Sequence, residues 1–187
     1  MTLFEYLTIA FGLLYSISAL RLVGGLPAAT APDRRYWVHL LLTLALLLLI
    51  ASGFWTFWSL REVVWTFLGF LLSLMVVGTL YYCAAVLVPE NPGQVTSWRA
   101  HYFAVRRRWY AGFMLWAVAI ALNASVNLGM SLTHPLRGVQ LVALGVGAVG
   151  VASSSPRVHA GLVLLFAVLV VGWSLSIGLN PGWLVQS

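Results

Sequence analysis

Residues 36–59 read YWVHLLLTLALLLLIASGFWTFWS, a mostly apolar stretch without a single Asp, Glu, Lys or Arg. About 20 consecutive apolar residues in an α-helix cross the hydrocarbon core of a bilayer, which is about 30 Å thick. In lipid the backbone amide and carbonyl groups must bond within the segment, and at this length only a helix achieves that. The stretch therefore predicts a transmembrane helix and an all-α fold.

The composition of the chain extends this expectation to all 187 residues. Apolar residues make up 61% of the sequence and charged residues only 7%, whereas a typical soluble domain has about 25% charged residues. So little polar surface could not cover a core of this size in water, which leaves lipid as the solvent. All ten basic residues are Arg, and the absence of Lys excludes a lysine nucleophile or a Schiff base.

Further apolar segments alternate with short stretches rich in Pro, Gly and charge, such as PENPGQVTSWRA at residues 89–100. The six predicted spans are Leu3–Val23, Tyr36–Ser59, Val63–Val88, Trp109–Leu128, Leu136–Ala152 and Val158–Leu179. The fifth is the weakest, because it is short and rich in small residues. Since every connection is short, we expect residues 1–187 to form a single membrane domain.

The arginines indicate how these spans are oriented. Eight of the ten fall at the first, third and fifth connections, whereas Arg61 and Arg137 fall at the other end. Because cytoplasmic loops are enriched in Arg and Lys, this bias predicts that both termini face outward. Aromatic residues are expected to form interface belts, with Tyr36, Trp37, Tyr81, Tyr82, Trp98, Trp109 and Tyr110 on the inner side and Phe4, Tyr6, Trp55, Trp58, Trp65 and Trp183 on the outer side.

Residues 97–113, SWRAHYFAVRRRWYAGF, place an arginine run directly before the fourth predicted span. A voltage sensor would space its arginines through the span, whereas three consecutive arginines point in different directions. Their aromatic neighbours suit a membrane interface, so nucleic acid is not an expected partner. We interpret the run as an anchor at the headgroups that contacts anionic lipid, or alternatively an acidic loop of a partner protein, through Arg99, Arg106, Arg107, Arg108 and Trp109, with Tyr102 and Tyr110 also at the headgroups.

Three motifs give the chain a resemblance to a family of small six-helix bacterial inner-membrane proteins. These motifs are FEYL at residues 4–7, WTFLGFLL at 65–72 and RAHYFAVRRRWYAGF at 99–113. The resemblance covers nearly the whole chain and implies the bacterial cytoplasmic (inner) membrane as its location. It implies no activity and no catalytic residue.

Three histidines, His39, His101 and His159, fall on the predicted inner side, each closely after an arginine. We expect them to bond to headgroups or to helix ends, as histidines near helix termini do. Three imidazoles could also hold a metal ion, and two from facing helices could hold a haem, so the metal site stays an alternative. The sequence predicts no cofactor.

Polar residues also gather on the predicted outer side. Asn123 and Asn127 are four residues apart and therefore lie on one helix face. Polar side chains at this depth usually bond to neighbouring helices, and an outward-open vestibule for a small polar ligand is the alternative. The outer polar cluster comprises Glu5, Arg61, Glu62, Asn123, Asn127, His134 and Arg137.

The second half of the fifth predicted span carries Gly145, Gly147 and Gly150. Small residues let another helix approach closely, in the same chain or in the next one. We expect Gly147 to contact a neighbouring chain, so that a larger residue there would disrupt association more than it disrupts the monomer.

The distribution of ionisable residues bears on function. No Asp, Glu, Arg or His falls near the middle of a predicted span, which argues against an ion-coupled transporter. The sequence lacks the patterns of a catalytic nucleophile, of paired carboxylates and of a phosphate-binding loop, so we do not expect an enzyme.

We therefore expect a non-catalytic accessory or assembly subunit that packs against other membrane proteins, lipids or cofactors, or against copies of itself. A homo-oligomeric channel or uncoupled facilitator for a small solute or ion is the alternative. A membrane enzyme, or a haem or metal protein that uses the inner histidines, is a more remote one.

A cysteine introduced at Pro92 tests the orientation. The third connection carries part of the arginine excess, so this thiol should react with a membrane-impermeant maleimide only from the cytoplasmic side. The unmodified chain, whose single Cys83 is expected to be buried, is the control for background labelling. Labelling from outside would reverse the orientation.

Overall fold

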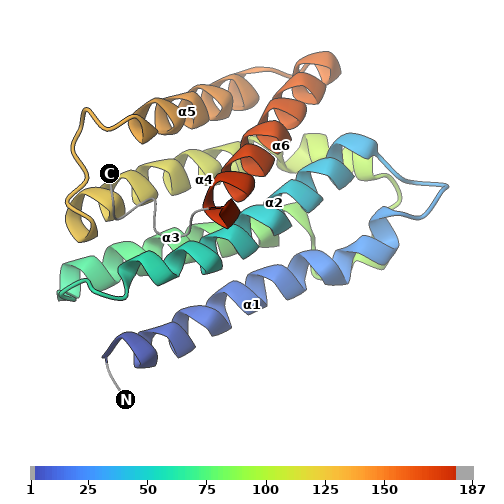
Figure 1. The fold of residues 1–187 in the computed structure, drawn as a ribbon. Helices are drawn as coiled ribbons and strands as arrows, with labels where there is room; N and C mark the ends of the chain where they lie inside the picture. Colours follow the sequence, from blue (N-terminus) through green and yellow to red (C-terminus); the bar gives the residue numbers. More distant parts are fainter. Residues whose placement is uncertain (1–2, 180–187) are drawn as a thin grey trace.

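The computed structural model describes residues 3–179 and shows an all-helical protein, which confirms the predicted fold class (Figure 1). The helices that it contains are α1 (Leu3–Ala29), α2 (Trp37–Thr56), α3 (Phe67–Leu87), α4 (Trp98–Asn127), α5 (Leu136–Ala152) and α6 (Pro156–Leu179). Two short 3₁₀ helices, η1 (Phe57–Leu60) and η2 (Pro92–Gln94), lie in the connections. Trp183 of the predicted outer belt lies outside the described residues.

Five of these helices, α1, α2 extended by η1, α3, α4 and α6, are long and apolar enough to cross a membrane. The fifth predicted segment coincides with α5, which is apolar but has only 17 residues. The length and apolar character of the five helices indicate a multi-pass membrane protein.

Several helices differ from their predicted boundaries. α1 runs further than predicted, to Ala29, and includes Pro27. α3 begins at Phe67 rather than at Val63. The hydroxyl of Thr66 accepts a hydrogen bond from the Gly69 amide 3.1 Å away, and this N-cap fixes the first turn.

The start of α4 is the largest difference from the prediction. The helix begins at Trp98 instead of Trp109, because the Ser97 hydroxyl accepts a hydrogen bond from the Ala100 amide and caps the helix there. α4 is consequently 30 residues long. The arginine run is therefore part of α4 itself and not a separate helix before it.

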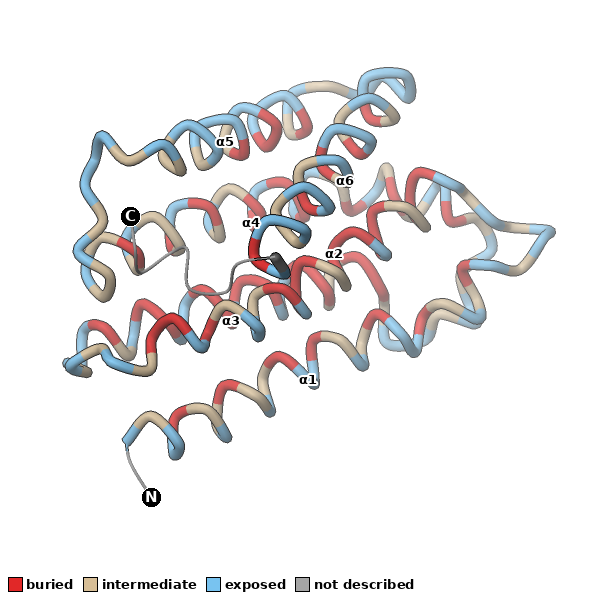
Figure 2. Tube along the Cα trace, viewed as in Figure 1, coloured by how far each residue is buried: buried red, intermediate tan, exposed pale blue. Residues whose placement is uncertain are grey.

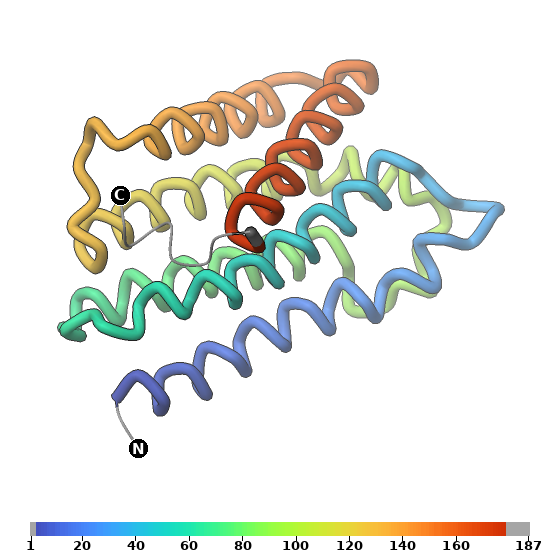
Figure 3. The backbone as a smooth tube through the Cα atoms, in the orientation of Figure 1, coloured from blue at the N-terminus to red at the C-terminus, as the bar shows by residue number. Residues whose placement is uncertain are grey.

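Each helix runs roughly antiparallel to the helix before it in the chain (Figures 1 and 3). α3 packs between α1 and α4, α4 packs against α5, and α2 contacts both α1 and α6. α5 and α6 meet near their short connection and then diverge, so that α6 crosses toward α2 while α5 stays beside α4 (Figure 1). This divergence separates the first half of α5 from the second half of α6.

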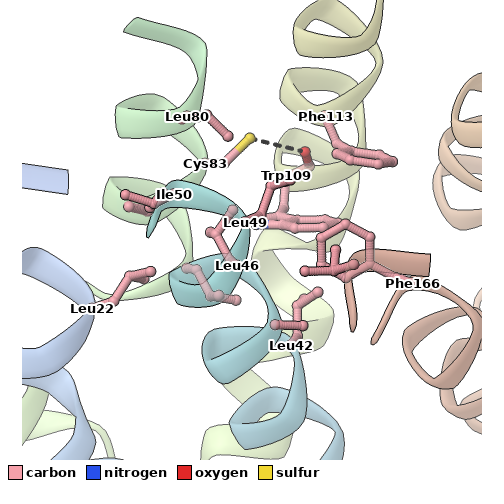
Figure 4. Close-up of a cluster of buried hydrophobic side chains, with 14 of the residues drawn as sticks. Leu22, Leu42, Leu46, Leu49, Ile50, Leu80, Cys83, Trp109, Phe113 and Phe166 are labelled. Atoms are coloured by element: carbon pink, nitrogen blue, oxygen red, sulfur yellow. Dashed lines mark hydrogen bonds between the residues drawn. The ribbon is translucent and has the colours of Figure 1, made fainter. Parts of the chain in front are cut away.

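The core combines apolar side chains from α1, α2, α3, α4 and α6, including Leu22, Leu46, Cys83, Trp109 and Phe166 (Figure 4). Cys83 is 1% exposed, and its thiol lies 4.0 Å from the carbonyl oxygen of Trp109. The expectation of a buried cysteine is confirmed.

Every α-helix of the described chain has exposed positions along its length (Figure 2), and large apolar residues occupy many of them. Examples are Leu13 of α1, Leu115 of α4, Leu141 of α5 and Val168 of α6, each at least half exposed. Soluble proteins rarely expose continuous apolar surface of this extent, so lipid or another membrane protein must cover it.

Two glycines of α5, Gly147 and Gly150, lie against α4 of the same chain. A Cβ atom at Gly147 would clash with the Met114 side chain, and one at Gly150 would come within 2.5 Å of the Tyr110 ring. Gly145 faces outward, and a Cβ atom there would meet nothing within 4 Å. The expectation that Gly147 contacts a neighbouring chain is therefore wrong, because α4 already occupies that face.

The substitution Gly147→Leu should lower the free energy of unfolding of the monomer by about 1–3 kcal/mol, because the added side chain overpacks the α4–α5 contact. Gly145→Leu adds the same side chain to the outward face of α5 and is the matched control. Thermal unfolding of both variants in mild detergent is the measurement. Equal melting temperatures for the two variants would contradict the assigned faces of α5.

Candidate functional site

Two of the inner histidines bond to one backbone carbonyl. The Nε2 atoms of His39 and His101 lie 3.1 and 3.0 Å from the carbonyl oxygen of Leu87, the last residue of α3. A carbonyl can only accept, so both imidazoles carry their proton on Nε2 and donate it. The last carbonyls of a helix lack partners within the helix, and these two side chains cap α3.

Trp98 lies beside both histidines, with ring centroids 4.4 Å from His39 and 5.5 Å from His101. Its indole Nε1 donates a hydrogen bond of 2.9 Å to the carbonyl of Ala28, near the end of α1. Trp98 is 0% exposed and belongs to the core rather than to the predicted inner belt.

Arginines complete the capping at this end of the molecule. The Nε atom of Arg21 donates to the carbonyl of Val88, and Nη1 of Arg34 donates to the carbonyls of Gly93 and Val95. α1 and the connection that follows it are thereby tied to the connection between α3 and α4.

The third inner histidine belongs to a separate network. His159 Nε2 lies 3.1 Å from the carbonyl oxygen of Ser153, so it donates there, and Nδ1 must accept. The Tyr102 hydroxyl lies 2.9 Å from Nδ1 and therefore donates to it. The same oxygen then accepts from the Tyr110 hydroxyl at 3.2 Å. This chain joins α4, α6 and the end of α5.

These networks separate the three candidate metal ligands. The His39 and His101 rings are 6.1 Å apart, whereas His159 is bound to a tyrosine and to a carbonyl in the other network. Within residues 3–179 no group of three His, Cys, Asp or Glu side chains is placed to hold a metal ion. The three-imidazole site proposed as an alternative is therefore not assembled.

The arginine run divides between the inside and the outside of the bundle. Arg106 is half-buried and donates from Nε to the carbonyl of Ser153 at 3.0 Å and from Nη1 to that of Phe103 at 3.2 Å. Arg99, Arg107 and Arg108 are exposed. The latter three remain free to contact lipid or a partner protein.

The aromatic residues of the run do not lie at the headgroups as predicted. Trp109 is 2% exposed, and Tyr102 and Tyr110 are each 1% exposed. The Trp109 ring stacks on Phe113 at 5.5 Å and contacts Phe166 of α6 edge-on. The prediction that these three rings contact lipid is wrong, because they share the face of α4 that packs against the other helices.

The outer polar cluster divides into separate parts. Glu5 lies in the first turn of α1, and Arg61 and Glu62 form an exposed ion pair of 3.0 Å. Asn123 and Asn127 bond across to α3, whereas Arg137 bonds to the end of α4 and to the α4–α5 connection. The cluster predicted as one group therefore does not form a single site.

The asparagines link α3 and α4. The Nδ2 group of Asn127 bonds to the carbonyl of Gly69 at 3.0 Å, to Ser73 Oγ at 3.2 Å and to Asn123 Oδ1 at 2.8 Å. Ser73 Oγ in turn donates to Asn123 Oδ1 at 2.8 Å. Gly69 is required here, since a Cβ atom at that position would clash with Asn127 Oδ1.

Arg137 uses all five of its N–H donors within the protein. Nη2 donates to Ser125 Oγ at 2.6 Å and to the carbonyl of Met130 at 2.8 Å, and Nε donates to the carbonyl of Ser131 at 3.2 Å. Nη1 donates to the carbonyl of Ala121 at 2.9 Å and to Oε1 of Gln140 at 3.0 Å. The sequence analysis did not predict these partners, and the three-residue spacing of Arg137 and Gln140 was the one available signal.

A cavity of about 210 Å³ lies beside Asn123, and its mostly apolar wall differs from the vestibule for a small polar ligand that the sequence analysis kept as an alternative. α2, η1, α3, α4, α5 and α6 all contribute to its lining. Apolar and aromatic side chains form most of the wall, and its polar members include Ser59, Ser73, Asn123 and Gln140. Among the described residues, this cavity and its polar members form the arrangement best suited to hold a ligand.

The substitution Asn127→Leu should lower the free energy of unfolding by about 2 kcal/mol, because the partly buried acceptors bonded to its Nδ2 group lose a donor. Asn91→Leu, at an exposed position in the connection before α4, is the matched control. Unfolding in mild detergent measures both. An unchanged midpoint for Asn127→Leu would show that the asparagine network does not hold α3 to α4.

Comparison with known proteins does not extend this description. No family model matches the chain, and no curated protein or solved structure matches it. The resemblance to a bacterial membrane-protein family therefore remains a sequence-based expectation. The case for a function rests on the geometry of the polar networks, the apolar surface and the cavity.

Proposed function

We propose that this chain is a non-catalytic accessory or assembly subunit that packs against other proteins and lipids in the membrane. One observation carries the proposal: several polar side chains between the helices bond to the protein's own backbone or to one another, while large apolar residues are exposed on the outer surface. His39, His101, Asn127 and Arg137 all follow this pattern. Polar groups used in this way hold helices together and leave no continuous polar path for an ion.

The proposed arrangement has six spans with both termini outside, in the bacterial cytoplasmic membrane. The hydrogen bonds of Arg21, Arg34 and Arg106 bring these arginines to the same end of the helix bundle, where Arg107 and Arg108 also project. A cytoplasmic location of this end agrees with the enrichment of arginine there. The exposed arginines of α4 then contact anionic headgroups, each with about 1 kcal/mol.

The outward face of α5 is the proposed contact with a neighbouring membrane protein. Gly145 lies on this face with Leu141, Val142 and Val149, which are each at least 46% exposed. A glycine among larger apolar residues lets a second helix approach closely, which strengthens van der Waals packing in lipid.

Purification in mild detergent tests the proposal. A stoichiometric membrane protein, or a second copy of the chain, should co-purify, and Gly145→Leu should weaken this association without lowering the melting temperature. Gly161→Leu is the matched control, since Gly161 of α6 is likewise open to the outside. Liposomes that contain the protein alone should show no gradient-driven flux. A selective conductance from the isolated protein would instead support the channel alternative.

A further inference from the structure

We propose that the cavity between α4, α5 and α6 binds a neutral, membrane-soluble ring compound that carries carbonyl oxygens, the chemistry of a quinone head group. This inference goes beyond the proposed role as a subunit. It rests on the position of the cavity, on the shape and polarity of its wall, and on two amide groups of that wall.

α5 and α6 diverge away from their connection (Figure 3), and both helices contribute to the wall of the cavity. Its wall includes Val139 and Gln140 from the first half of α5, and Leu169 and Trp173 from the second half of α6. Val139 both lines the cavity and is 47% exposed. It lies on the apolar surface that faces lipid, so a ligand would enter sideways from the membrane.

The wall selects for an aromatic or similarly flat, uncharged molecule. Phe113 and Trp116 line it as a stacked pair, with ring planes 17° apart and centroids at 5.5 Å, and Phe166 contacts Phe113 edge-on. Within residues 3–179, none of the lining side chains is charged. The volume of about 210 Å³ exceeds the roughly 150 Å³ of an apolar cavity that accepts benzene, so a substituted ring fits.

The amide orientation of Asn123 is fixed by its neighbours. The carbonyl of Gly69 can only accept, so the atom of Asn127 that bonds to it is the nitrogen. This same nitrogen bonds to Asn123, whose bonded atom must therefore be the oxygen. The Nδ2 group of Asn123 is left with two N–H donors and no acceptor within the described chain.

Gln140 is fixed in the same way from α5. Nη1 of Arg137 can only donate, so the atom of Gln140 that it contacts is Oε1. The Nε2 group of Gln140 then has no acceptor within residues 3–179. Asn123 and Gln140 both line the cavity. Both offer donors, so the ligand that completes the site is one with hydrogen-bond acceptors, such as carbonyl oxygens.

Two probes of the same ring shape separate hydrogen bonding from apolar fit. Menadione carries two ring carbonyls, and 2-methylnaphthalene has the same bicyclic ring and methyl group without them. Equilibrium dialysis against the full chain in detergent, corrected with protein-free micelles, gives both affinities. Menadione should bind at least about tenfold more tightly, the difference expected from one or two added hydrogen bonds.

The variant Gln140→Glu keeps an oxygen for Arg137 but replaces the free N–H donors with a second oxygen, which repels a carbonyl. It should reduce the menadione preference about tenfold or more while the melting temperature stays close to that of the unmodified chain. Gln94→Glu, made at an exposed position in η2 far from the cavity wall, is the matched control and should leave the preference unchanged.

Filling the cavity provides an independent test. Ala143 lines it and is 9% exposed, so Ala143→Phe should abolish binding of both probes, and Val139→Phe at the mouth should do the same if the first variant does not fold. Equal affinities for the two probes, a preference that survives Gln140→Glu, or no binding of either probe would each overturn the proposal. The last result would leave the cavity as a packing defect.

Discussion

A carbonyl group at a helix end that is buried from water must find a donor within the protein. The end of the molecule where α3 ends and α4 begins satisfies that constraint with side chains from neighbouring helices, since Leu87 and Val88 are at most 1% exposed. Leu87 receives two histidines, Val88 receives Arg21, and Ala28 receives Trp98. Each of these bonds joins two different helices or their connections. Helix capping and helix packing are therefore the same set of interactions here, and the bundle depends on them.

The fold class and most of the helices could be predicted from the sequence, because apolar length alone specifies a membrane helix. α5 has the predicted boundaries, Leu136 to Ala152. The start of α4 could not be predicted from hydropathy, since a capping serine extends the helix through a basic segment. The sequence also could not predict which face of each helix is buried. Trp37 is 52% exposed and Trp98 0%, although both begin helices at the same end.

There is a physical reason why the sequence could not predict the buried faces. In water, a polar face identifies the outside of a helix, whereas in lipid both the core and the surroundings are apolar. The candidate site shows the same limit. The spacing of Asn123 and Asn127 placed them on one face, but their partners Gly69 and Ser73 lie at least 50 positions away. The cavity depends on the divergence of α5 and α6, which no local pattern of residues encodes.

Neighbouring helices of unequal length have a consequence for the bilayer itself. At about 1.5 Å per residue, α4 with 30 residues is about 45 Å long and α5 with 17 residues is about 25 Å long. The hydrocarbon core is about 30 Å thick, so in the proposed six-span arrangement α5 falls short of it, and a bilayer meets a short span by thinning. In that arrangement lipid headgroups should dip toward the molecule along α5. A molecule at the interface would then have its shortest path through hydrocarbon beside this helix.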